Sequence, residues 1–482
     1  MNLLWTANDL VAAMAGRPVG PMPAGVTGIS IDTRTLQPGE AFFAIKGDQF
    51  DGHDFATAAI KAGAGLLVVA EGRLASFGRL HGPMIVVPDV LEALAKAGAA
   101  ARERSKAKII AVTGSAGKTS TKEALRTALS SVGNVHASDK SFNNHWGVPL
   151  TLARMPVDTD YAIFEIGMNH SGEIRPLVKL VRPHIAIVTM IAAAHLGFFR
   201  DLEEIATAKA EIFEGVEPGG HALVNRDDAR FKQLEKAAHD AGIENVWGFG
   251  EHSRATFKLV KTKLMPEGAT FTAKLAGEEV VAKIGAPGRH MVQNAIAVLA
   301  ASYLAGADMA KVAHALADIQ PEAGRGERHL LSHGQGAFTL IDESYNANPA
   351  SVRAAMDVLQ ATPVSGHGRR IAVLGDMLEL GTHSATLHGE LADAIDPSVT
   401  GIVLLVGPEM KALAAALPDS IRVEHRETVS ELQPVLLNLV RAGDVVMIKS
   451  SKSIGASKLV TALREKFQAA EQAAPEEIHQ DA

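Results

Sequence analysis

The sequence predicts an α/β protein of three domains, in which a central parallel sheet lies between a smaller N-terminal α/β domain and a Rossmann-like C-terminal domain. Apolar runs alternate with helical stretches from about residue 107, and this alternation begins again at about residue 321. The first hundred residues instead open with the proline- and glycine-rich segment GRPVGPMPAGVTG and contain shorter strands. The expected domains are 1–106, 107–320 and 321–466, followed by an expected disordered tail at 467–482, which is rich in alanine, glutamate and glutamine.

The strands expected in the central domain are nearly continuous in apolar residues, as strands buried on both faces of a parallel sheet should be. They are AKIIAVTG, DYAIFEIG and PHIAIVTMI. Five strands, each beside a helical segment, are expected in the C-terminal sheet: FTLIDES, RRIAVLGD, GIVLLVG, IRVEH and DVVMIKS. In the N-terminal domain we expect the strands AFFAIKG and GLLVVAEG around a helix at ATAAIKAGA.

Composition excludes several classes of function. The chain has 482 residues and no cysteine, so it can form neither a disulfide nor a thiolate metal site, which fits a reducing compartment. Its formal charge is 47 minus 54, or −7, and no basic tract stands out, so nucleic acid is not an expected partner. The opening segment 1–16 lacks the basic flank of a signal peptide, and the apolar run 185–199 is too short to cross a bilayer. We therefore expect a cytoplasmic monomer without a membrane span.

The strongest motif is a glycine-rich loop between a strand and a helix. The strand Ile109–Thr113 leads into the loop, and the apolar positions that follow recur on one helical face. Glycines let backbone amides surround phosphate oxygens, while a lysine reaches the terminal phosphates and a hydroxyl can ligate magnesium. The residues expected to bind the phosphates of ATP are Gly114, Ser115, Ala116, Gly117, Lys118, Thr119 and Ser120. On its own, the loop leaves GTPases, kinases, ATPases and ligases open.

Two further strands end in polar residues that could join this loop. The strand Tyr161–Glu165 ends in a carboxylate, and the strand Ile185–Ile191 leads to His195. Because ligands bind outside the carboxyl ends of strands in open α/β sheets, we expect Thr119, Glu165 and His195 to converge on one cleft. Magnesium prefers oxygen ligands, so Glu165 fits well, whereas His195 could equally be a hydrogen-bonded residue at a strand end. In the helical segment ATAKAEIF, the sequence alone favours a solvated surface charge for Lys209.

Together these motifs resemble those of the Mur ligases, the ATP-dependent amide ligases of peptidoglycan precursor synthesis. The loop TGSAGKTST, shorter than the usual form, is similar to theirs, and EIGMNHSGEI, AAAHLGFF, ATAKAEIF, GRHMVQNAIA and GRGE resemble their magnesium and nucleotide segments. FNNHWGVPLTL, IDESYNANPAS and VLGDMLELG resemble the member that adds D-alanyl-D-alanine to the UDP-N-acetylmuramoyl tripeptide, and SIDTRTLQPGEAFFAIKGDQFDGHDF resembles its UDP-sugar-binding domain. Three positions depart from the family pattern: Met190, Ser450 and Lys452, the last replacing an arginine.

The resemblance implies a role for each matched residue. Lys118 and Thr119 would hold phosphates and magnesium, Glu165 and His195 would bind two metal ions, and Lys209 would be a carbamylated metal ligand, which reverses the reading as a surface charge. The other implied nucleotide-binding residues are Asn294 at the adenine, Arg325 at the phosphates and Asp342 at the ribose. The implied substrate-binding residues are Thr33, Arg34, Lys46 and Gly47 for the uridine diphosphate, Asn143 and Asn144 for the muramoyl substrate, and Tyr345, Asn346 and Asn348 for the nucleotide or dipeptide.

The implied reaction is amide-bond formation between the tripeptide carboxylate and D-alanyl-D-alanine through an acyl phosphate made from ATP. Two alternatives remain within related enzymes: a sister Mur ligase that adds a single amino acid, and a folylpolyglutamate synthetase. A third, of another class, is a phosphate-loop NTPase switch without ligase activity. It would hydrolyse ATP without an amine, whereas a ligase would release phosphate only with both co-substrates.

Overall fold

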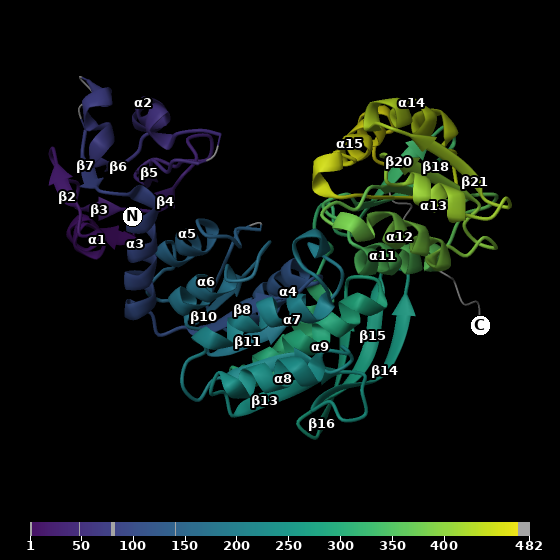
Figure 1. The fold of residues 1–482 in the computed structure, drawn as a ribbon, viewed down its shortest axis with the longest axis horizontal. Helices are drawn as coiled ribbons and strands as arrows, with labels where there is room; N and C mark the ends of the chain where they lie inside the picture. Colours follow the sequence, from purple (N-terminus) through teal and green to yellow (C-terminus); the bar gives the residue numbers. More distant parts are fainter. Residues whose placement is uncertain (1, 48, 79–81, 140, 471–482) are drawn as a thin grey trace, which may run out of the picture.

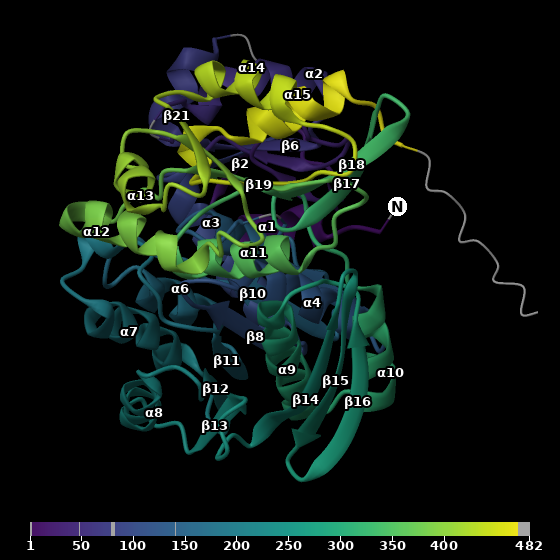
Figure 2. The same cartoon turned by 90° about the vertical axis from the view of Figure 1, so that its right-hand side faces the viewer.

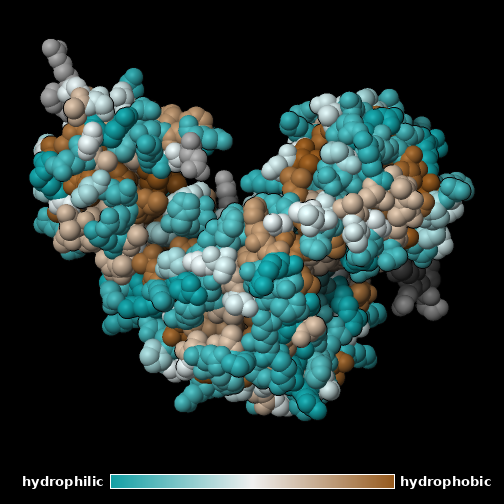
Figure 3. All heavy atoms as spheres, in the orientation of Figure 1, coloured by the Kyte–Doolittle hydropathy of each residue, from teal (hydrophilic) through white to brown (hydrophobic). Residues whose placement is uncertain are grey.

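The computed structural model describes residues 2–47, 49–78, 82–139 and 141–470. The chain forms three lobes, each built on its own sheet, and a further two-stranded pair, β1 (Trp5–Thr6) with β3 (Gly25–Val26), lies in the first lobe. In Figure 1 the N-terminal and C-terminal lobes both rest on the middle lobe and stand apart from each other, and Figure 3 shows the open hollow between them. The predicted α/β class with three units is confirmed.

The N-terminal lobe contains a five-stranded sheet in the order β2-β7-β6-β5-β4. Its strands are β2 (Arg17–Val19), β4 (Ile29–Ser30), β5 (Ala41–Phe43), β6 (Leu66–Ala70) and β7 (Met84–Val87). Its helices are α1 (Ala7–Met14), α2 (Ala56–Lys61) and α3 (Val90–Arg104). Thr6 caps α1 and Asp89 caps α3 through side-chain oxygens that accept backbone N–H groups, so both helices begin where the sequence supplies a capping residue.

The middle lobe is a nine-stranded sheet in the order β16-β15-β14-β13-β12-β11-β8-β10-β9. Its parallel strands are β8 (Lys108–Thr113), β9 (Val135–Ala137), β10 (Tyr161–Glu165), β11 (Ile185–Val188), β12 (His221–Asn225) and β13 (Asn245–Gly250). Its helices are α4 (Lys118–Ser130), α5 (Gly147–Ala153), α6 (Ile174–Val181), α7 (Leu202–Ala210), α8 (Phe231–Asp240), α9 (Arg289–Leu304) and α10 (Met309–Ala315). The strand β8, which enters the glycine-rich loop, is buried between β10 and β11.

One edge of the middle sheet differs from the expected purely parallel arrangement. The strands β14 (Phe257–Met265), β15 (Gly268–Leu275) and β16 (Glu278–Ile284) form an antiparallel meander that extends the sheet. Figure 2 shows these long strands beside α9. Alternate residues of the meander, such as Phe271 and Ala273, are buried under α9 while their neighbours are less buried, which is the pattern of a sheet covered on one face.

The C-terminal lobe is a six-stranded sheet in the order β17-β18-β22-β19-β20-β21. The five expected strands are present as β18 (Gly336–Glu343), β19 (Arg370–Gly375), β20 (Ile402–Val406), β21 (Arg422–Arg426) and β22 (Val445–Lys449). The sixth, β17 (Glu327–His333), was not expected and pairs antiparallel with β18. The helices are α11 (Pro349–Ala361), α12 (Ser384–Gly389), α13 (Lys411–Ala416), α14 (Val429–Leu439) and α15 (Ser457–Lys466).

The chain after α15 is ordered for a few residues. The side chain of Phe467 is buried against β17 and β18, and the N–H of Ser332 donates to the carbonyl of Gln468. Residues 471–482, most of the expected tail, lie outside the described residues. Across the part of the chain that the structure describes, no helix combines the length and the apolar character that a membrane crossing requires.

The N-terminal and middle lobes are joined through α3 and α5. The indole of Trp5 donates to the carbonyl of Ala153 at 2.8 Å, and the guanidinium of Arg154 donates to the carbonyl of Ile29 at 2.7 Å. Arg104 at the end of α3 lies over the Trp5 ring, 3.5 Å from its centroid. These buried contacts fix the first lobe to the side of the middle sheet that carries β10.

Candidate active site

The glycine-rich loop lies at the carboxyl edge of the middle sheet, where three neighbouring strands end together. Glu165, the last residue of β10, is in register with Val112, and Val188, the last residue of β11, is in register with Thr113. The polar segments that follow β8, β10 and β11 therefore leave the sheet at one edge, as open α/β topology requires.

Two glycines give the loop its shape. Gly114 has φ +150, and a Cβ there would lie 1.9 Å from the Thr189 hydroxyl oxygen. Gly117 has φ +82, and its Cβ would lie 2.8 Å from Oδ1 of Asn294, so this adenine-site candidate on α9 lies directly behind the loop. Left-handed backbone and close approach both require glycine at these positions. The loop then ends where Lys118 and the buried Thr119 begin α4, whose N-terminus favours anions.

Lys118 is at the centre of the charged groups around the loop. Its ammonium donates to the carbonyl of Gly114 at 2.5 Å. Burial lowers the pKa of Lys118, the charge of Glu165 opposes that effect, and the positive charge of Arg325 adds to it. Because Arg325 comes from the segment that leads into the C-terminal lobe, charged groups of the middle and C-terminal lobes act on the same lysine.

Glu165 is fully buried, and its two carboxylate oxygens differ. Oε1 accepts a hydrogen bond from the Asn143 amide at 2.8 Å, whereas the buried Oε2 has no hydrogen-bond partner among the described residues. Neighbouring Asn144 has a local role, because its side-chain oxygen accepts the N–H of Gly147 at the start of α5. A buried carboxylate oxygen without a partner is energetically unfavourable unless a cation or a water molecule binds to it. This oxygen therefore fits a magnesium ligand.

Lys209 in the last turn of α7 is almost completely buried, with 1% of its surface exposed. Its ammonium has no hydrogen-bond or ion-pair partner within the described ranges. Burial lowers its pKa well below the usual lysine value, and the nearby charge of Lys118 lowers it further. The sequence-only interpretation as a solvated surface lysine is wrong, since the side chain of Lys209 is buried.

His195 follows β11 and lies near both lysines. Burial lowers its pKa, the charges of Lys118 and Lys209 lower it further, and the carboxylate of Glu379 opposes these effects. The contact with Glu379, a residue of the C-terminal lobe, is an Nδ1 to Oε2 distance of 2.5 Å. A neutral histidine is the form that binds a metal ion, so burial and the two lysines favour the metal-binding form.

Besides Glu379, two residues of the C-terminal lobe bond to the middle lobe near the loop. Asn348 caps α11 and its amide donates to the carbonyl of Ser115 at 3.3 Å, while the hydroxyl of Tyr345 donates to the Ser141 hydroxyl at 2.8 Å. The guanidinium of Arg325 lies over the Tyr345 ring at 4.2 Å. Asn346 is exposed and makes its described bonds within its own lobe: its backbone carbonyl accepts a hydrogen bond from the ammonium of Lys449, and its Oδ1 accepts the N–H of Ala347.

The segment that carries Arg325 is bonded to the C-terminal lobe. The N–H of Gly326 donates to the carbonyl of Asp342, and the N–H of Tyr345 donates to the carbonyl of Gly324. Both glycines have positive φ. Arg325 therefore keeps its place relative to β18, and its distance from the phosphate loop depends on how the C-terminal lobe sits on the middle lobe.

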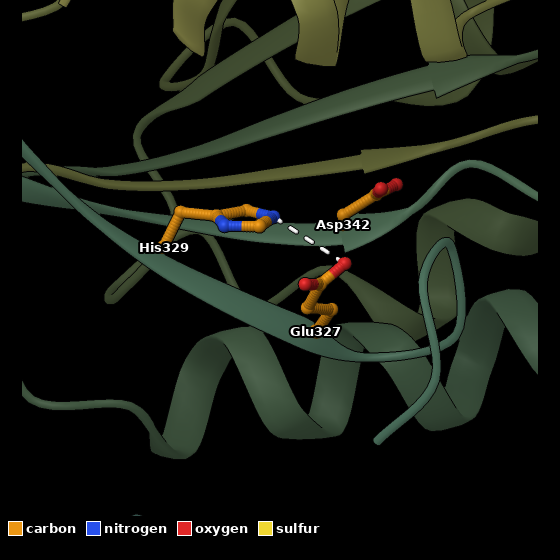
Figure 4. A group of neighbouring side chains, drawn as sticks. All are labelled: Glu327, His329 and Asp342. Carbon is orange, nitrogen blue, oxygen red and sulfur yellow. Dashed lines mark ion pairs between the residues drawn. The ribbon is translucent and has the colours of Figure 1, made fainter. Parts of the chain in front are cut away.

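Asp342 belongs to a second acidic group, shown in Figure 4. Its Oδ1 accepts hydrogen bonds from the backbone and hydroxyl of Ser344, and ligand atoms of Asp342, Glu327 and His329 lie within 4.8 Å of one another. Nε2 of His329 lies 3.6 Å from Glu327 and has no hydrogen-bond partner in the described chain. Glu327 ends the segment GRGE, but neither Glu327 nor His329 was predicted as a site residue, because the strand β17 that places them opposite β18 was not expected.

Two small adjoining hollows lie beside α9 and the segment of Arg325, and the larger also borders α4. Met291, Pro321 and Arg325 line both. The larger is also lined by Ser120, in the first turn of α4. The smaller is lined by Glu343 and Val358 of the C-terminal lobe, so these hollows lie where the middle and C-terminal lobes meet.

The four uridine-diphosphate candidates lie in the N-terminal lobe, and no described contact joins them to the loop. The Arg34 guanidinium pairs with Asp32 and is largely exposed, and the N–H of Gly47 donates to the carbonyl of Phe50. Thr33 is part of the same turn as Arg34, and the backbone of Lys46 pairs with that of Asp51 in an isolated antiparallel β-bridge. A substrate contacting both this lobe and the loop would have to lie along the hollow seen in Figure 3.

The departures near the end of β22 have distinct surroundings. Ser450 is fully buried and its hydroxyl donates to the carbonyl of Ser451. Lys452 lies 5.2 Å from the Tyr345 ring, which Arg325 also covers. The ammonium of Lys452 is therefore near the site, although it lacks the planar two-pronged geometry of arginine.

Comparison with known proteins accounts for nearly the whole chain. Residues 25–102 match the family described as "Mur ligase family, catalytic domain", 112–302 match "Mur ligase middle domain", and 324–452 match "Mur ligase, glutamate ligase domain". A UDP-N-acetylmuramoyl-tripeptide--D-alanyl-D-alanine ligase of Rickettsia prowazekii (strain Madrid E) is 35% identical, and the alignment covers 90% of this chain and 94% of the relative. The ligase of the same name from Escherichia coli (strain K12) is 36% identical, with 91% and 93% covered.

The fold gives the same result. The crystal structure of MurF from Acinetobacter baumannii superposes with a TM-score of 0.82 at 30% identity, covering 96% of this chain and 99% of that one. All three lobes therefore have counterparts in one known architecture. The chain belongs to the Mur ligase family.

Proposed function

We propose that this protein is the ATP-dependent ligase that joins D-alanyl-D-alanine to the UDP-N-acetylmuramoyl tripeptide, a step of peptidoglycan precursor synthesis. Relatives with this printed name align over about nine-tenths of both chains, which favours this reading over a folylpolyglutamate synthetase. The observation that carries the chemistry is that Lys118 begins α4 at the end of the glycine-rich loop, at the sheet edge where the buried Glu165 keeps an Oε2 without a partner among the described residues. That arrangement provides a cationic site for the terminal phosphates of ATP.

A carboxylate does not acylate an amine at neutral pH because its oxygen is a poor leaving group. The terminal carboxylate oxygen of the tripeptide attacks the γ-phosphorus of ATP, ADP leaves, and an acyl phosphate forms. The free amine of D-alanyl-D-alanine then attacks the acyl carbon, and inorganic phosphate leaves with that carboxylate oxygen. Lys118 and Arg325 stabilise the charge that spreads over the phosphoryl oxygens, and the Gly114 carbonyl releases the Lys118 ammonium when phosphate binds.

We further propose that the residues around the loop hold two magnesium ions. Thr119, Glu165, His195 and Lys209 would hold them, and the free Oε2 of Glu165 is the observation that supports a cation. When bound, magnesium neutralises charge on the phosphate oxygens. Lys209 would serve as a carbamate: its neutral amine adds to the carbon of carbon dioxide and releases one proton, giving an anionic oxygen ligand. Its lowered pKa supports this because it increases the fraction of neutral amine.

The remaining residues extend the site to the three substrates. Asn294 and Asp342 would hold the adenosine end of ATP next to the two small hollows beside α9, with the loop residues around its phosphates. Thr33, Arg34, Lys46 and Gly47 would bind the uridine diphosphate, and Asn143 and Asn144 the muramoyl end. Tyr345, Asn346, Asn348 and Lys452 would line the dipeptide side. We further propose that the enzyme acts as a cytoplasmic monomer.

Phosphate release from ATP tests this function. The purified protein should release phosphate only when both the UDP-muramoyl tripeptide and D-alanyl-D-alanine are present. Stimulation by a single amino acid but not by the dipeptide would identify a sister ligase instead. Release that needs no amine would identify an NTPase switch.

A further inference from the structure

A short contact joins the middle and C-terminal lobes at the edge of the proposed metal site. The segment after His195 meets the segment Glu379–Gly381, and two polar bonds connect them. The Nδ1 atom of His195 lies 2.5 Å from Oε2 of Glu379, and the N–H of Gly197 donates to the carbonyl of Glu379 at 2.7 Å. One glutamate therefore holds both the imidazole and the backbone that follows it.

The two backbones touch so closely that side chains are excluded between them. A Cβ on Gly197 would lie 2.9 Å from the backbone nitrogen of Gly381, and a Cβ on Gly381 would lie 2.8 Å from the Cα of Gly197. His195 and Glu379 have φ values of 61 and 65, and they are two of the five non-glycine residues with positive φ in the described chain. Because this conformation is unfavourable for both residues, the contact is held by surrounding structure.

Two features distinguish this contact from an ordinary surface ion pair between lobes: the choice of partners and the ring nitrogen that is left free. Glu379 has no second basic partner in the described chain, and His195 is the residue from the metal edge of the sheet. With Nδ1 bound to the carboxylate, Nε2 of His195 is left without a hydrogen-bond partner among the described residues. A carboxylate that accepts from one ring nitrogen fixes the tautomer and orientation in which the other nitrogen can bind a metal ion.

We infer that Glu379 is a positioning residue for His195, so that docking of the C-terminal lobe presents Nε2 of this histidine to the metal ion. The inference rests on the proposed function, because that function assigns the metal to this edge. Arg325 and Glu379 then act together: one brings positive charge to the phosphates, the other orients a metal ligand, and both arrive with the same lobe. By linkage, a bound metal–nucleotide complex favours the docked lobe as much as docking favours metal binding.

Other contacts between the lobes do not explain the geometry. The bonds of Asn348 to Ser115 and of Tyr345 to Ser141 reach the loop region without touching a candidate metal ligand. Glu379 alone among these C-terminal residues bonds to the side chain of such a ligand. Its removal should therefore weaken metal binding specifically.

The experiment compares three variants in the full chain. Glu379→Asn suits the left-handed backbone but is one carbon shorter and uncharged, so it cannot reach Nδ1 in the same way. Glu379→Gln keeps the length and loses the charge. Glu390→Gln, which changes an exposed glutamate of the same lobe, is the matched control.

The first measurement is Mn²⁺ affinity in the presence of a non-hydrolysable ATP analogue, by electron paramagnetic resonance. Loss of such an outer carboxylate typically weakens metal binding by about 10- to 100-fold. We expect about a tenfold loss for Glu379→Asn, a smaller loss for Glu379→Gln and none for Glu390→Gln. Unchanged Mn²⁺ affinity in both Glu379 variants would overturn the inference.

The second measurement needs no metal. Nitrogen-15 spectra of histidine-labelled protein, with the His195 signals assigned by their absence in His195→Gln, report which ring nitrogen carries the proton. The wild type should show His195 protonated at Nδ1, and Glu379→Asn should shift the proton towards Nε2. The same tautomer in both proteins would contradict the inference. If the wild type shows these effects but makes no amide bond, the proposed function fails and the positioning role stands.

Discussion

Replacing Lys209 with methionine should abolish ligase activity and yet stabilise the folded middle lobe. Methionine is unbranched like lysine and only one atom shorter, but it carries no amine. The residue Lys209 is only 1% exposed, its side-chain nitrogen has no hydrogen-bond or ion-pair partner among the described residues, and the charge of Lys118 disfavours a second positive charge there. The structure therefore keeps an unfavourable group in its interior, which is typical of a group needed for function rather than stability.

The expected size follows from that burial. Burying a polar group without compensation costs about 1–3 kcal/mol in proteins. Removing the amine should therefore raise the free energy of unfolding of the middle lobe by about 1–3 kcal/mol. For a domain of this size each kcal/mol raises the melting temperature by about 2–4 °C, so the variant should melt about 2–12 °C higher.

The assay compares thermal unfolding of wild type and Lys209→Met in buffer free of carbon dioxide, and then with added bicarbonate. Bicarbonate should stabilise the wild type, because a carbamate on Lys209 would face the positive Lys118, and it should leave the variant unchanged. Phosphate release should be lost in the variant. A variant that melts lower than wild type, or that keeps its turnover, would refute the role given to this lysine.

Three further predictions concern other parts of the molecule. Gly114→Ala places a Cβ against the Thr189 hydroxyl and should weaken ATP binding at least tenfold by calorimetry, whereas unchanged affinity would show that the loop adapts. Burial lowers the pKa of His136, so the folded middle lobe keeps this side chain neutral. The contribution of His136 to stability should be greatest above about pH 6.5 and should fall at lower pH, because the unfolded chain then takes up a proton that the folded chain does not. In the His136→Gln variant, the free energy of unfolding measured by urea titration should depend less steeply on pH below about pH 6.5. The same pH dependence in variant and wild type would contradict this prediction. Tyr345→Phe removes the hydrogen bond to Ser141 and keeps the aromatic ring that Arg325 covers. We expect kcat/KM to drop about two- to tenfold. A larger loss would mean that the hydroxyl contacts the substrate.

Local patterns were sufficient to predict the parts of the fold that depend on neighbouring residues. The buried strands β8, β10 and β11 are continuous apolar runs, and their order places the loop next to Glu165, so this edge of the sheet could be expected from the sequence. The antiparallel meander β14–β16 and the strand β17 were missed. Their alternating residues are half exposed, and a weak period-two pattern did not stand out beside the strong parallel strands.

The parts that depend on contacts between lobes could not be predicted in the same way. Nothing in the sequence around Glu379 indicates that it contacts His195, which is 184 positions away. The segment VLGDMLELG, which contains Glu379, resembles a Mur ligase segment but does not indicate this contact. Burial of Lys209 was likewise invisible to local pattern, because a lysine on a short helix is usually solvated. Only the resemblance to the Mur ligases suggested that Lys209 is a site residue, and its burial became visible in the structure.

The most direct test of the central claim follows one oxygen atom. The tripeptide substrate carries oxygen-18 in its terminal carboxylate, and the phosphate released during ligation to D-alanyl-D-alanine is analysed by mass spectrometry. Activation through an acyl phosphate predicts one labelled oxygen in each phosphate, with the other label retained in the new amide. Unlabelled phosphate would contradict the account, because it would mean that water, not the carboxylate, attacks the γ-phosphorus on this loop.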